Sequence, residues 1–424
     1  MNKFESITEC ISWIENQKRK HEKKDLNDMY ALCELFGNPQ DSFKVIHVAG
    51  TNGKGSIVSY MQSILQVAGY RVGTFTSPYI ECFNERIQIN KHHIKDEHIL
   101  HYANMIISKY DLIDEDKKPS FFSFITLMSF LYFRDMKVDY AVVECGIGGL
   151  LDDTNVVKPV LSIISNVSYD HMNILGDTIE EIAKNKLGIV KEKTPLVTIQ
   201  NDQIKQLIKE KCYEMYAPYT VVRKKAITNV RLGIGETKFD YCEYKDVKLR
   251  MNGLYQCENA SVAIEAVRFL NLQGANISKE NVMEGLSKTF WLGRLELVST
   301  RPIIILDDAH NVDGITRLVE YIESIHQHRQ VRLILAISAN KDKEHMIPLV
   351  DNAVDEIIFS SFAYKRSDDA INLFSLSNHK NKLLENDIDK ILEYIKKDNW
   401  INIFSGSLYF VSELRKKIKA LKNK

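Results

Sequence analysis

The sequence predicts an α/β protein of two domains, a larger N-terminal one built on a parallel sheet and a smaller, Rossmann-like C-terminal one. Three observations lead to this prediction. A glycine-rich turn joins an apolar strand to a helix near residue 50, and strand-like and helix-like stretches alternate along most of the chain. At 424 residues, the chain is also too long for one ordinary core. We place the boundary between Gly293 and Arg294, so that the domains span 1–293 and 294–424.

The glycine-rich turn has the composition of a phosphate-binding loop. Residues 44–49 suit a buried parallel strand, and apolar residues recur at helical spacing after the turn. Between them lie the predicted loop residues Gly50, Thr51, Asn52, Gly53, Lys54, Gly55 and Ser56. Such a loop presents backbone N–H groups to phosphate, while Lys54 can reach the terminal phosphates and the Ser56 hydroxyl can bind magnesium. Val48 stands where the standard loop has its first glycine, but three glycines around a lysine still predict a nucleotide site.

Two later strands end in polar residues that we expect at the same edge of the sheet. Residues 137–145 form an apolar run that ends near Glu144, and residues 160–167 lead to His171. Ligands of open parallel sheets gather outside the carboxyl ends of the strands, and a carboxylate there suits magnesium. From the residues alone, a solvent-facing Glu144 and a hydrogen-bonded core His171 remain alternatives, although two strands ending beside one crevice favour function.

A lysine on the apolar side of a predicted helix indicates a special environment. Residues 175–191 predict a helix capped by Asp177 or Thr178, and Lys186 falls among its apolar residues. An ammonium group there is costly unless it is modified or paired. The next residues, 201–250, are strand-like, and we expect them to complete the first domain.

A second alternation of strands and helices starts at Ile303. It predicts strands at 303–306, 331–337, 355–360 and 400–404, and helices at 312–325, 343–353 and after Ser407. This pattern predicts the smaller α/β domain.

Composition excludes several classes of function. Lys plus Arg and Asp plus Glu both number 56, which leaves no overall basic field for nucleic-acid binding. No run approaches the roughly eighteen apolar residues of a membrane span, so we predict no membrane partner. The seven cysteines are scattered without a Cys-x-x-Cys pair, which indicates reduced thiols in a cytoplasmic protein without a zinc site.

Short motifs in a fixed order connect these features to a known family. They are 47–56, Thr76-Ser77-Pro78, Asn84-Glu85-Arg86, 144–155, Asp170-His171, 174–191, Asn259-Ala260, Gly293-Arg294-Leu295-Glu296, Asp307 with Ala309-His310-Asn311, Lys341-Asp342 and Gly406-Ser407-Leu408-Tyr409. In order and spacing, they resemble folylpolyglutamate synthase, often bifunctional with dihydrofolate synthase, in the Mur ligase superfamily. The resemblance extends from about Leu26 to Arg415. It implies a Mur ligase-like, P-loop-type ATPase domain followed by a glutamate-ligase domain.

The resemblance implies an ATP-dependent amide ligase that acts as a monomer. ATP would phosphorylate a carboxylate of a folate or of dihydropteroate, and the amine of L-glutamate would attack the acyl phosphate. Residues 50–56 would hold the triphosphate, with Lys54 on the γ-phosphate. The other nucleotide-binding residues would be Asn259, Arg294 and Asp307. Closure of the two domains would exclude water from the acyl phosphate.

The resemblance also implies a two-magnesium site and a substrate site. The expected magnesium ligands are Ser56, Ser77, Glu144 and His171. Lys186 matches a lysine that is carbamylated in this family, which would turn the cation into a carboxylate facing magnesium. The expected catalytic residues are Lys186, Lys54 and His310, which would lie near the transferred phosphoryl group. The expected substrate-binding residues are Ser77, Arg86, Ser123, Leu151, Asp152 and Asp153.

Six positions depart from the family pattern. The family commonly has Glu, Arg, His, Gly and Asp at the positions of Ser123, Leu150, Tyr255, Asp308 and Asn340, and often has an Arg near Asp28. Asp28, Ser123 and Leu150 fall where the family holds the pterin and its linker. These departures leave open the preferred folate, the polyglutamate chain length and the presence of the dihydrofolate synthase step.

Three other functions compete with this interpretation. Another Mur-type amino-acid ligase is disfavoured because the phosphate loop starts too early for an N-terminal UDP-binding domain. A GTPase-like switch is suggested by Asn340-Lys341-Asp342, but Lys343 stands where the guanine-binding motif needs Asp. A catalytically weakened folate-binding relative fits the pterin-side departures, yet the retained lysines, Glu144 and His171 favour an enzyme.

Overall fold

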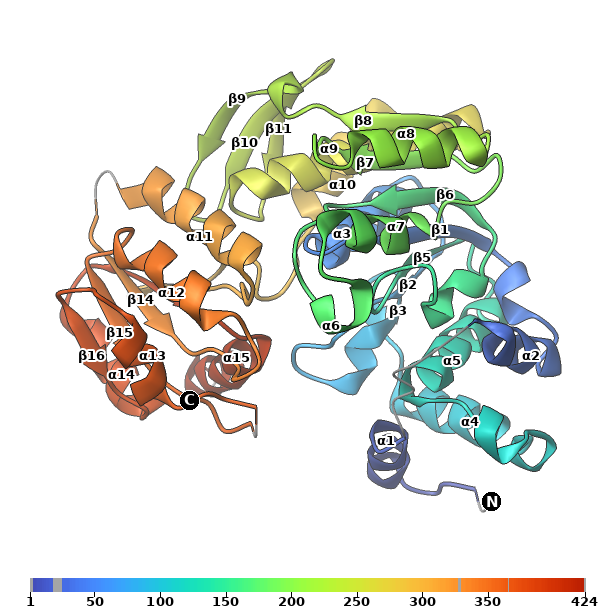
Figure 1. Cartoon of the computed structure of the whole chain (residues 1–424), viewed down its shortest axis with the longest axis horizontal. Coiled ribbons are helices and arrows are strands. Elements are labelled where there is room, and N and C mark those ends of the chain that lie inside the picture. The colour runs from blue at the N-terminus through green and yellow to red at the C-terminus, as the bar shows by residue number, and fades with distance from the viewer. Residues whose placement is uncertain (1–2, 18–24, 327–328, 365, 423–424) are drawn as a thin grey trace. The chain divides into compact units, whose positions relative to one another are not determined.

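The structure is a computed structural model that describes residues 3–17, 25–326, 329–364 and 366–422. Its contacts divide the chain into two compact units, which can be followed by colour in Figure 1. The first unit comprises Met1–Ala226 and Asn259–Leu286, and the second comprises Ile227–Glu258 and Ser287–Lys424. This grouping places 227–258 in the second unit, whereas the domain boundary expected after Gly293 stays a prediction.

An eight-stranded sheet forms the centre of the first unit. Its order is β4-β3-β2-β5-β1-β6-β7-β8, and only the pairings of β3 with β2 and with β4 are antiparallel. The strands are β1 (Lys44–Ala49), β2 (Val72–Phe75), β3 (Ile87–Ile89), β4 (His92–His93), β5 (Tyr140–Glu144), β6 (Pro159–Ile164), β7 (Leu196–Ile199) and β8 (Tyr219–Val222). Because β1 lies between β5 and β6, the glycine-rich loop begins in the middle of the carboxyl edge, the edge where the parallel strands end.

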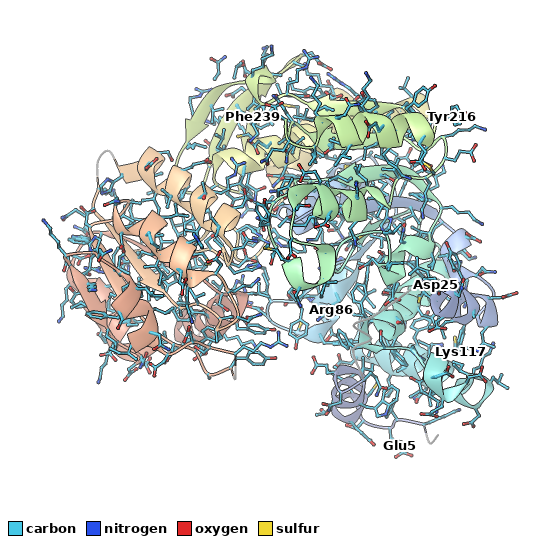
Figure 2. All side chains as sticks on the ribbon, in the orientation of Figure 1. Glu5, Asp25, Arg86, Lys117, Tyr216 and Phe239 are labelled. Carbon is cyan, nitrogen blue, oxygen red and sulfur yellow. The ribbon has the colours of Figure 1, made fainter. Side chains whose placement is uncertain are left out.

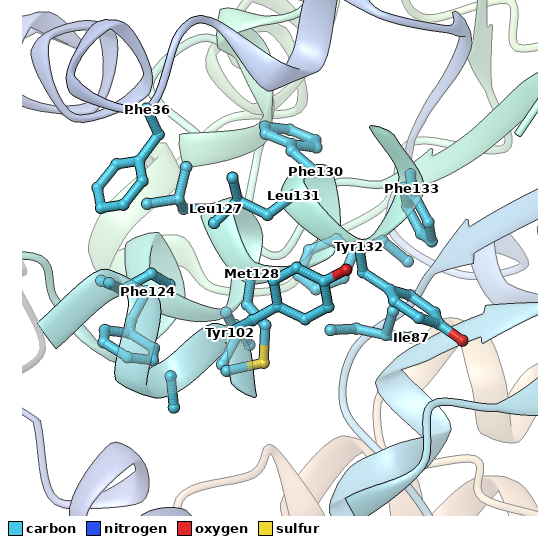
Figure 3. Close-up of a cluster of buried hydrophobic side chains, with 14 of the residues drawn as sticks. Phe36, Ile87, Tyr102, Phe124, Leu127, Met128, Phe130, Leu131, Tyr132 and Phe133 are labelled. Atoms are coloured by element: carbon cyan, nitrogen blue, oxygen red, sulfur yellow. The ribbon is translucent and has the colours of Figure 1, made fainter. Parts of the chain in front are cut away.

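The helices of this unit cover the sheet with two buried clusters. They are α1 (Ile7–Glu15), α2 (Asn27–Leu35), α3 (Lys54–Val67), α4 (Asp96–Ile107), α5 (Phe121–Asp135), α6 (Met172–Leu175), α7 (Ile179–Leu187), α8 (Lys205–Glu214), most of α9 (Leu254–Leu272) and α10 (Lys279–Lys288). The larger cluster is centred on α5, whose apolar side chains pack with Phe36, Ile87 and Tyr102 (Figure 3). Burial of so many aromatic side chains makes this cluster the principal source of stability in the unit.

A capping box fixes the start of α7, the helix that carries Lys186. The Thr178 hydroxyl accepts a hydrogen bond from the Glu181 backbone N–H (3.2 Å), and the Glu181 carboxylate accepts one from Thr178 N–H (3.1 Å). The cap expected at Asp177 or Thr178 is therefore confirmed at Thr178. From this start, Ile179, Ile182 and Lys186 fall on the buried face.

A six-stranded sheet forms the centre of the second unit. Its order is β12-β13-β17-β14-β15-β16, with only β12 antiparallel to its neighbour. The strands are β12 (Glu296–Thr300), β13 (Ile303–Leu306), β14 (Val331–Leu335), β15 (Glu356–Phe359), β16 (Lys382–Leu384) and β17 (Ile401–Ser405). A separate antiparallel sheet contains β9 (Ile227–Leu232), β10 (Thr237–Tyr241) and β11 (Tyr244–Leu249).

Alternating residues of the strands pack into two apolar clusters on opposite faces of the six-stranded sheet. Ile305 packs with the first group of helices, and its neighbour Ile304 packs with the second. The first group is α11 (Val312–Ile325), α12 (Lys343–Asp351) and α13 (Ala370–Leu376), and the second is α14 (Ile388–Tyr394) and α15 (Leu408–Lys422). The predicted α/β alternation in this half of the chain is confirmed.

The prediction that residues 201–250 are strand-like is wrong for one segment. Residues 205–214 form the helix α8 rather than a strand, because Ile208 and Cys212 lie one turn apart and are buried together. The contacts of β9–β11 group these strands with the second unit, and their place in the expected first domain stays a prediction. Within the described ranges, no helix combines the length and apolarity that a membrane span needs.

Candidate active site

The glycine-rich loop is folded against the segment that follows β6. Gly50 has a φ of +148°, and a Cβ atom added to it would lie 1.8 Å from the Ser165 hydroxyl oxygen. Gly53 has a φ of +84° at the start of α3, and a Cβ atom there would lie 2.6 Å from Asn259 Oδ1. Any side chain at either position therefore clashes with a neighbour, so the loop depends on glycine for space as well as for backbone conformation.

Hydrogen bonds tie this loop to residues 165–168. Thr51 N–H donates to the Asn166 carbonyl (2.9 Å), and Asn52 N–H donates to Asn166 Oδ1 (2.7 Å). The Ser165 hydroxyl donates to the Asn52 carbonyl (2.6 Å), and Thr51 Oγ1 donates to Ser168 O (3.0 Å). Sequence reasoning missed Ser165 and Asn166, although their place directly after a buried parallel strand was the signal that could have found them.

Two lysine ammonium groups converge on one backbone carbonyl in the first unit. Lys54 Nζ donates to Gly50 O (3.1 Å) and Thr51 O (3.0 Å), and Lys186 Nζ donates to Gly50 O (2.9 Å). Lys54 Nζ also lies 4.0 Å from Glu144 Oε1. Burial and the positive charge of Lys54 lower the pKa of Lys186 to about 7, so that a large fraction of this amine is neutral at physiological pH. The arrangement places a cation, Lys54, and a readily neutralised amine, Lys186, at one carbonyl of the loop.

The four residues expected to bind magnesium differ in exposure. Ser56 and Glu144 are buried, Ser77 is partly buried, and His171 is exposed in a left-handed backbone conformation. Across the described part of the chain, no group of three or more His, Cys, Asp and Glu side chains is arranged to hold a metal. The expected set instead combines a carboxylate and a histidine with hydroxyl oxygens. The carboxylate and hydroxyl oxygens suit magnesium, which keeps several of its own waters, whereas the histidine would supply a nitrogen donor.

The expected substrate residues Asp152 and Asp153 are buried in a hydrogen-bonded loop. The Asp152 carboxylate accepts from Gly146 N–H (2.9 Å), Ile147 N–H (3.0 Å) and the Thr154 hydroxyl (2.5 Å). Ser123 Oγ donates to Asp153 Oδ2 (3.1 Å). Leu151 is partly buried beside them. These contacts give the two carboxylates structural roles in shaping the loop.

A buried histidine connects this loop to β1, and sequence reasoning missed it. His47 Nε2 lies 2.8 Å from Thr154 Oγ1, and burial lowers the His47 pKa to about 3. The ring is therefore neutral, and it bridges the strand that leads into the phosphate loop and the loop that contains Asp152.

The remaining expected substrate residue, Arg86, lies among aromatic rings. Its guanidinium carbon is 4.9 Å from the ring centre of Tyr79 and 5.2 Å from that of Phe121. Arg86 ends the short helix 83–86, at the position labelled in Figure 2. The rings keep the buried cation in one place, so it can act as a fixed positive charge.

Three expected site residues lie together in the second unit. The two Asp307 carboxylate oxygens accept from the backbone N–H groups of Leu295 and Ala309 (3.0 Å each), so Asp307 joins the turn before β12 to the end of β13. Arg294 forms an ion pair with Asp308. His310 Nδ1–H donates to Asp308 O (2.7 Å), which fixes the orientation of the imidazole. By contrast, Asn259 belongs to the first unit, where it contacts Gly53.

Comparison with known families matches both halves of the chain. The Mur ligase middle domain matches residues 48–267, and the glutamate ligase domain of Mur ligases matches residues 293–404. Among curated relatives, the chain is similar to a dihydrofolate synthase/folylpolyglutamate synthase of Bacillus subtilis, with 37% identity over 98% of this chain and 100% of the relative. It is 30% identical to a dihydrofolate synthetase of Saccharomyces cerevisiae, over 92% of this chain and 96% of the relative.

Solved structures show the same likeness over nearly the whole chain. A folylpolyglutamate synthase from Thermotoga maritima has a TM-score of 0.85 and 31% identity, covering 97% of this chain and 96% of that structure. A structure described as an FPGS-AMPPCP-folate complex has a TM-score of 0.84 and 28% identity, covering 97% and 99%.

Proposed function

This chain belongs to the Mur ligases, in the branch of folylpolyglutamate and dihydrofolate synthases, and on that premise we propose how it works and on what. It is an ATP-dependent ligase that joins L-glutamate to a carboxylate of a folate through an acyl phosphate. Dihydropteroate is its second acceptor, a proposal supported by the names of the relatives from B. subtilis and S. cerevisiae. The observation that carries the proposal is the convergence of Lys54 and Lys186 beside Glu144 at the carboxyl edge of the first sheet.

The first unit supplies the groups that bind and polarise the triphosphate. Because the Thr51 and Asn52 N–H groups are bonded to Asn166, the N–H groups at the start of α3 hold its phosphates, and Lys54 neutralises charge that develops on the γ-phosphoryl group. Magnesium, when bound by Ser56, Ser77, Glu144 and His171, supplies further charge neutralisation. The fixed cation Arg86 and the loop of Leu151, Asp152 and Asp153, held by Ser123, orient the folate so that its carboxylate faces the phosphate.

Carbamylation would convert Lys186 into an anion that, with the expected ligands, would hold magnesium. Its neutral amine forms an N–C bond with CO₂ and releases a proton, which converts a cation into a carboxylate. The lowered pKa of Lys186 supports this step, because only the neutral amine reacts. The carbamate oxygens add to the oxygen donors expected around magnesium.

The second unit contributes the remaining nucleotide and phosphoryl contacts. Arg294, with Asn259 of the first unit, binds the nucleotide, while Asp307 holds the turn that positions Arg294. His310, oriented by its bond to Asp308 O, lies near the transferred phosphoryl group. The enzyme acts as a monomer, and its free thiols support a cytoplasmic location.

Oxygen-18 transfer tests the proposed reaction directly. A folate monoglutamate labelled with oxygen-18 in its γ-carboxylate is incubated with the enzyme, magnesium, ATP and L-glutamate. An acyl phosphate mechanism transfers one labelled oxygen to the released phosphate, because the carboxylate oxygen stays bound to phosphorus when the amine attacks. Glutamate-dependent turnover that releases unlabelled phosphate would contradict the mechanism.

A further inference from the structure

The two adjacent carboxylates of the second unit have different partners. Both oxygens of Asp307 accept backbone N–H groups, from Leu295 and Ala309. Asp308 instead pairs with the Arg294 guanidinium, and both of these side chains are largely buried. Asp307 therefore shapes the backbone, and the charge of Arg294 is balanced at short range by Asp308.

The backbone of the turn that carries Arg294 is held without the Asp308 side chain. Its neighbours Gly293 and Leu295 both have positive φ angles, +65° and +46°. Gly293 N–H donates to Glu296 Oε2 (2.9 Å), and Glu296 in turn accepts two bonds of 3.0 Å from Arg415 Nε. The Asp308 N–H also donates to Gly293 O (2.8 Å), and none of these bonds uses the Asp308 side chain, so we expect a change of that side chain to leave the backbone of the turn in place.

We propose that Asp308 is a positioning residue that acts as an internal counter-ion to Arg294. A nucleotide phosphate must displace the Asp308 carboxylate from Arg294 in order to bind. The inference rests on the proposed role of Arg294 in nucleotide binding. A guanidinium recognises carboxylate and phosphate in the same planar manner, so the two compete for one cation. Asp308 therefore sets the affinity for the nucleotide.

The charges around Asp308 predict how pH affects this competition. The groups that act on it are Arg294, Asp307 and the phenol of Tyr255. Burial and the charge of Asp307 raise the Asp308 pKa to about 7, despite the opposing effect of Arg294, while Tyr255 stays protonated because its own pKa is raised. Above pH 7, the ionised carboxylate holds Arg294; below pH 7, it becomes neutral and releases the guanidinium. Nucleotide binding is therefore accompanied by proton uptake at Asp308.

Calorimetric titration with ADP and magnesium tests the inference on the full-length enzyme. The proteins are the wild type, Asp308→Asn, Arg294→Gln and the control Asp398→Asn, which removes a carboxylate from another buried arginine of this unit, Arg332. At pH 8, we expect Asp308→Asn to bind ADP about five- to tenfold more tightly, since one pKa unit of coupling is a factor of about ten. Asp398→Asn should match the wild type.

Proton uptake gives a second measurement that a merely structural role would not change. Titrations at pH 7.5 in buffers of different ionisation enthalpy report the protons taken up with ADP. The wild type should take up more protons on binding ADP than Asp308→Asn does. In the variant, the affinity for ADP should lose the part of its pH dependence that is centred near pH 7. The difference between the two proteins removes the contribution of the titrating phosphates themselves.

The outcomes separate this inference from the proposed function. If Arg294→Gln weakens ADP binding while Asp308→Asn matches the wild type in affinity and proton uptake, Asp308 is not a counter-ion and the nucleotide role of Arg294 stands. If Arg294→Gln binds ADP normally, the nucleotide role itself fails. Should Asp308→Asn not fold, Asp308→Ser replaces it as the reference, and equal proton uptake by the wild type and this variant overturns the inference.

Discussion

Each unit gathers an excess of one sign of charge at the carboxyl edge of its sheet. The excess is positive in the first unit and negative in the second. In the first unit, Lys54 and Lys186 converge on the carbonyl of Gly50. In the second, Asp307 and Asp308 lie beside the single guanidinium of Arg294. Burial first, and the like charge of a neighbour second, lower the pKa of Lys186 to about 7 and raise that of Asp308 to about 7, and burial also raises the pKa of Asp307. The first edge keeps the cation Lys54 for an anionic ligand, whereas the second pairs its own cation, Arg294, with Asp308.

The largest expected effect comes from removing the lysine of the phosphate loop. Lys54→Ala should lower glutamate-dependent ADP release on the order of a thousandfold, because the charge that develops on the transferred phosphoryl group loses its nearest cation. Steady-state assays with saturating magnesium measure the loss. Lys184→Ala, which removes an exposed lysine from α7, is the control and should remain active. Unchanged turnover in Lys54→Ala would remove the basis for a phosphate site in the first unit.

A smaller loss is expected when the loop is displaced without a change of charge. Gly50→Ala should reduce turnover on the order of a hundredfold, because its Cβ atom would lie 1.8 Å from the Ser165 hydroxyl oxygen and push the loop out of position. Gly37→Ala is a matched control, since Gly37 also has a positive φ, +75°, but no atom within 4 Å of an added Cβ. Similar losses in both variants would show that backbone strain, and not the contact with Ser165, is responsible.

The smallest of these effects concerns Lys186 and carbamylation. Lys186→Ala should lower turnover by about ten- to a hundredfold, in the range found for groups that tune a bound metal. Added bicarbonate should activate the wild type but not the variant. Activation should increase as pH rises through about 7, because the neutral fraction of the amine grows. A fully active Lys186→Ala enzyme, with no bicarbonate effect on the wild type, would contradict carbamylation.

Strong periodicity made most of the fold predictable from the sequence. The predicted bounds of β13 and α11 are those observed, because a wholly apolar run and an amphipathic helix leave little choice. Short edge elements gave no comparable signal: β16 has three residues and none is buried. Periodicity also could not assign β9–β11 to a unit, since packing against residues far along the chain decides that.

The candidate site was predictable where strand ends determine it. Glu144 ends β5 and the phosphate loop follows the adjacent strand β1, so their place at one edge of the sheet could be inferred from the sequence. The hydrogen bonds from the phosphate loop to Asn166 and the pairing of Arg294 with Asp308 were not predicted. Both depend on the direction of a side chain across a turn, and the spacing of residues in the sequence carries no information on that direction.

One measurement tests the central claim most directly. Glutamate-dependent ADP release is assayed with magnesium, using dihydropteroate and a reduced folate monoglutamate side by side, with Lys54→Ala as the control. We expect turnover with both acceptors and its loss in the variant. Turnover with the folate alone would show that dihydropteroate is not an acceptor, and Ser123 and Leu150 would be the residues to test next. No turnover with either acceptor would contradict the assignment of this chain as a folate–glutamate ligase.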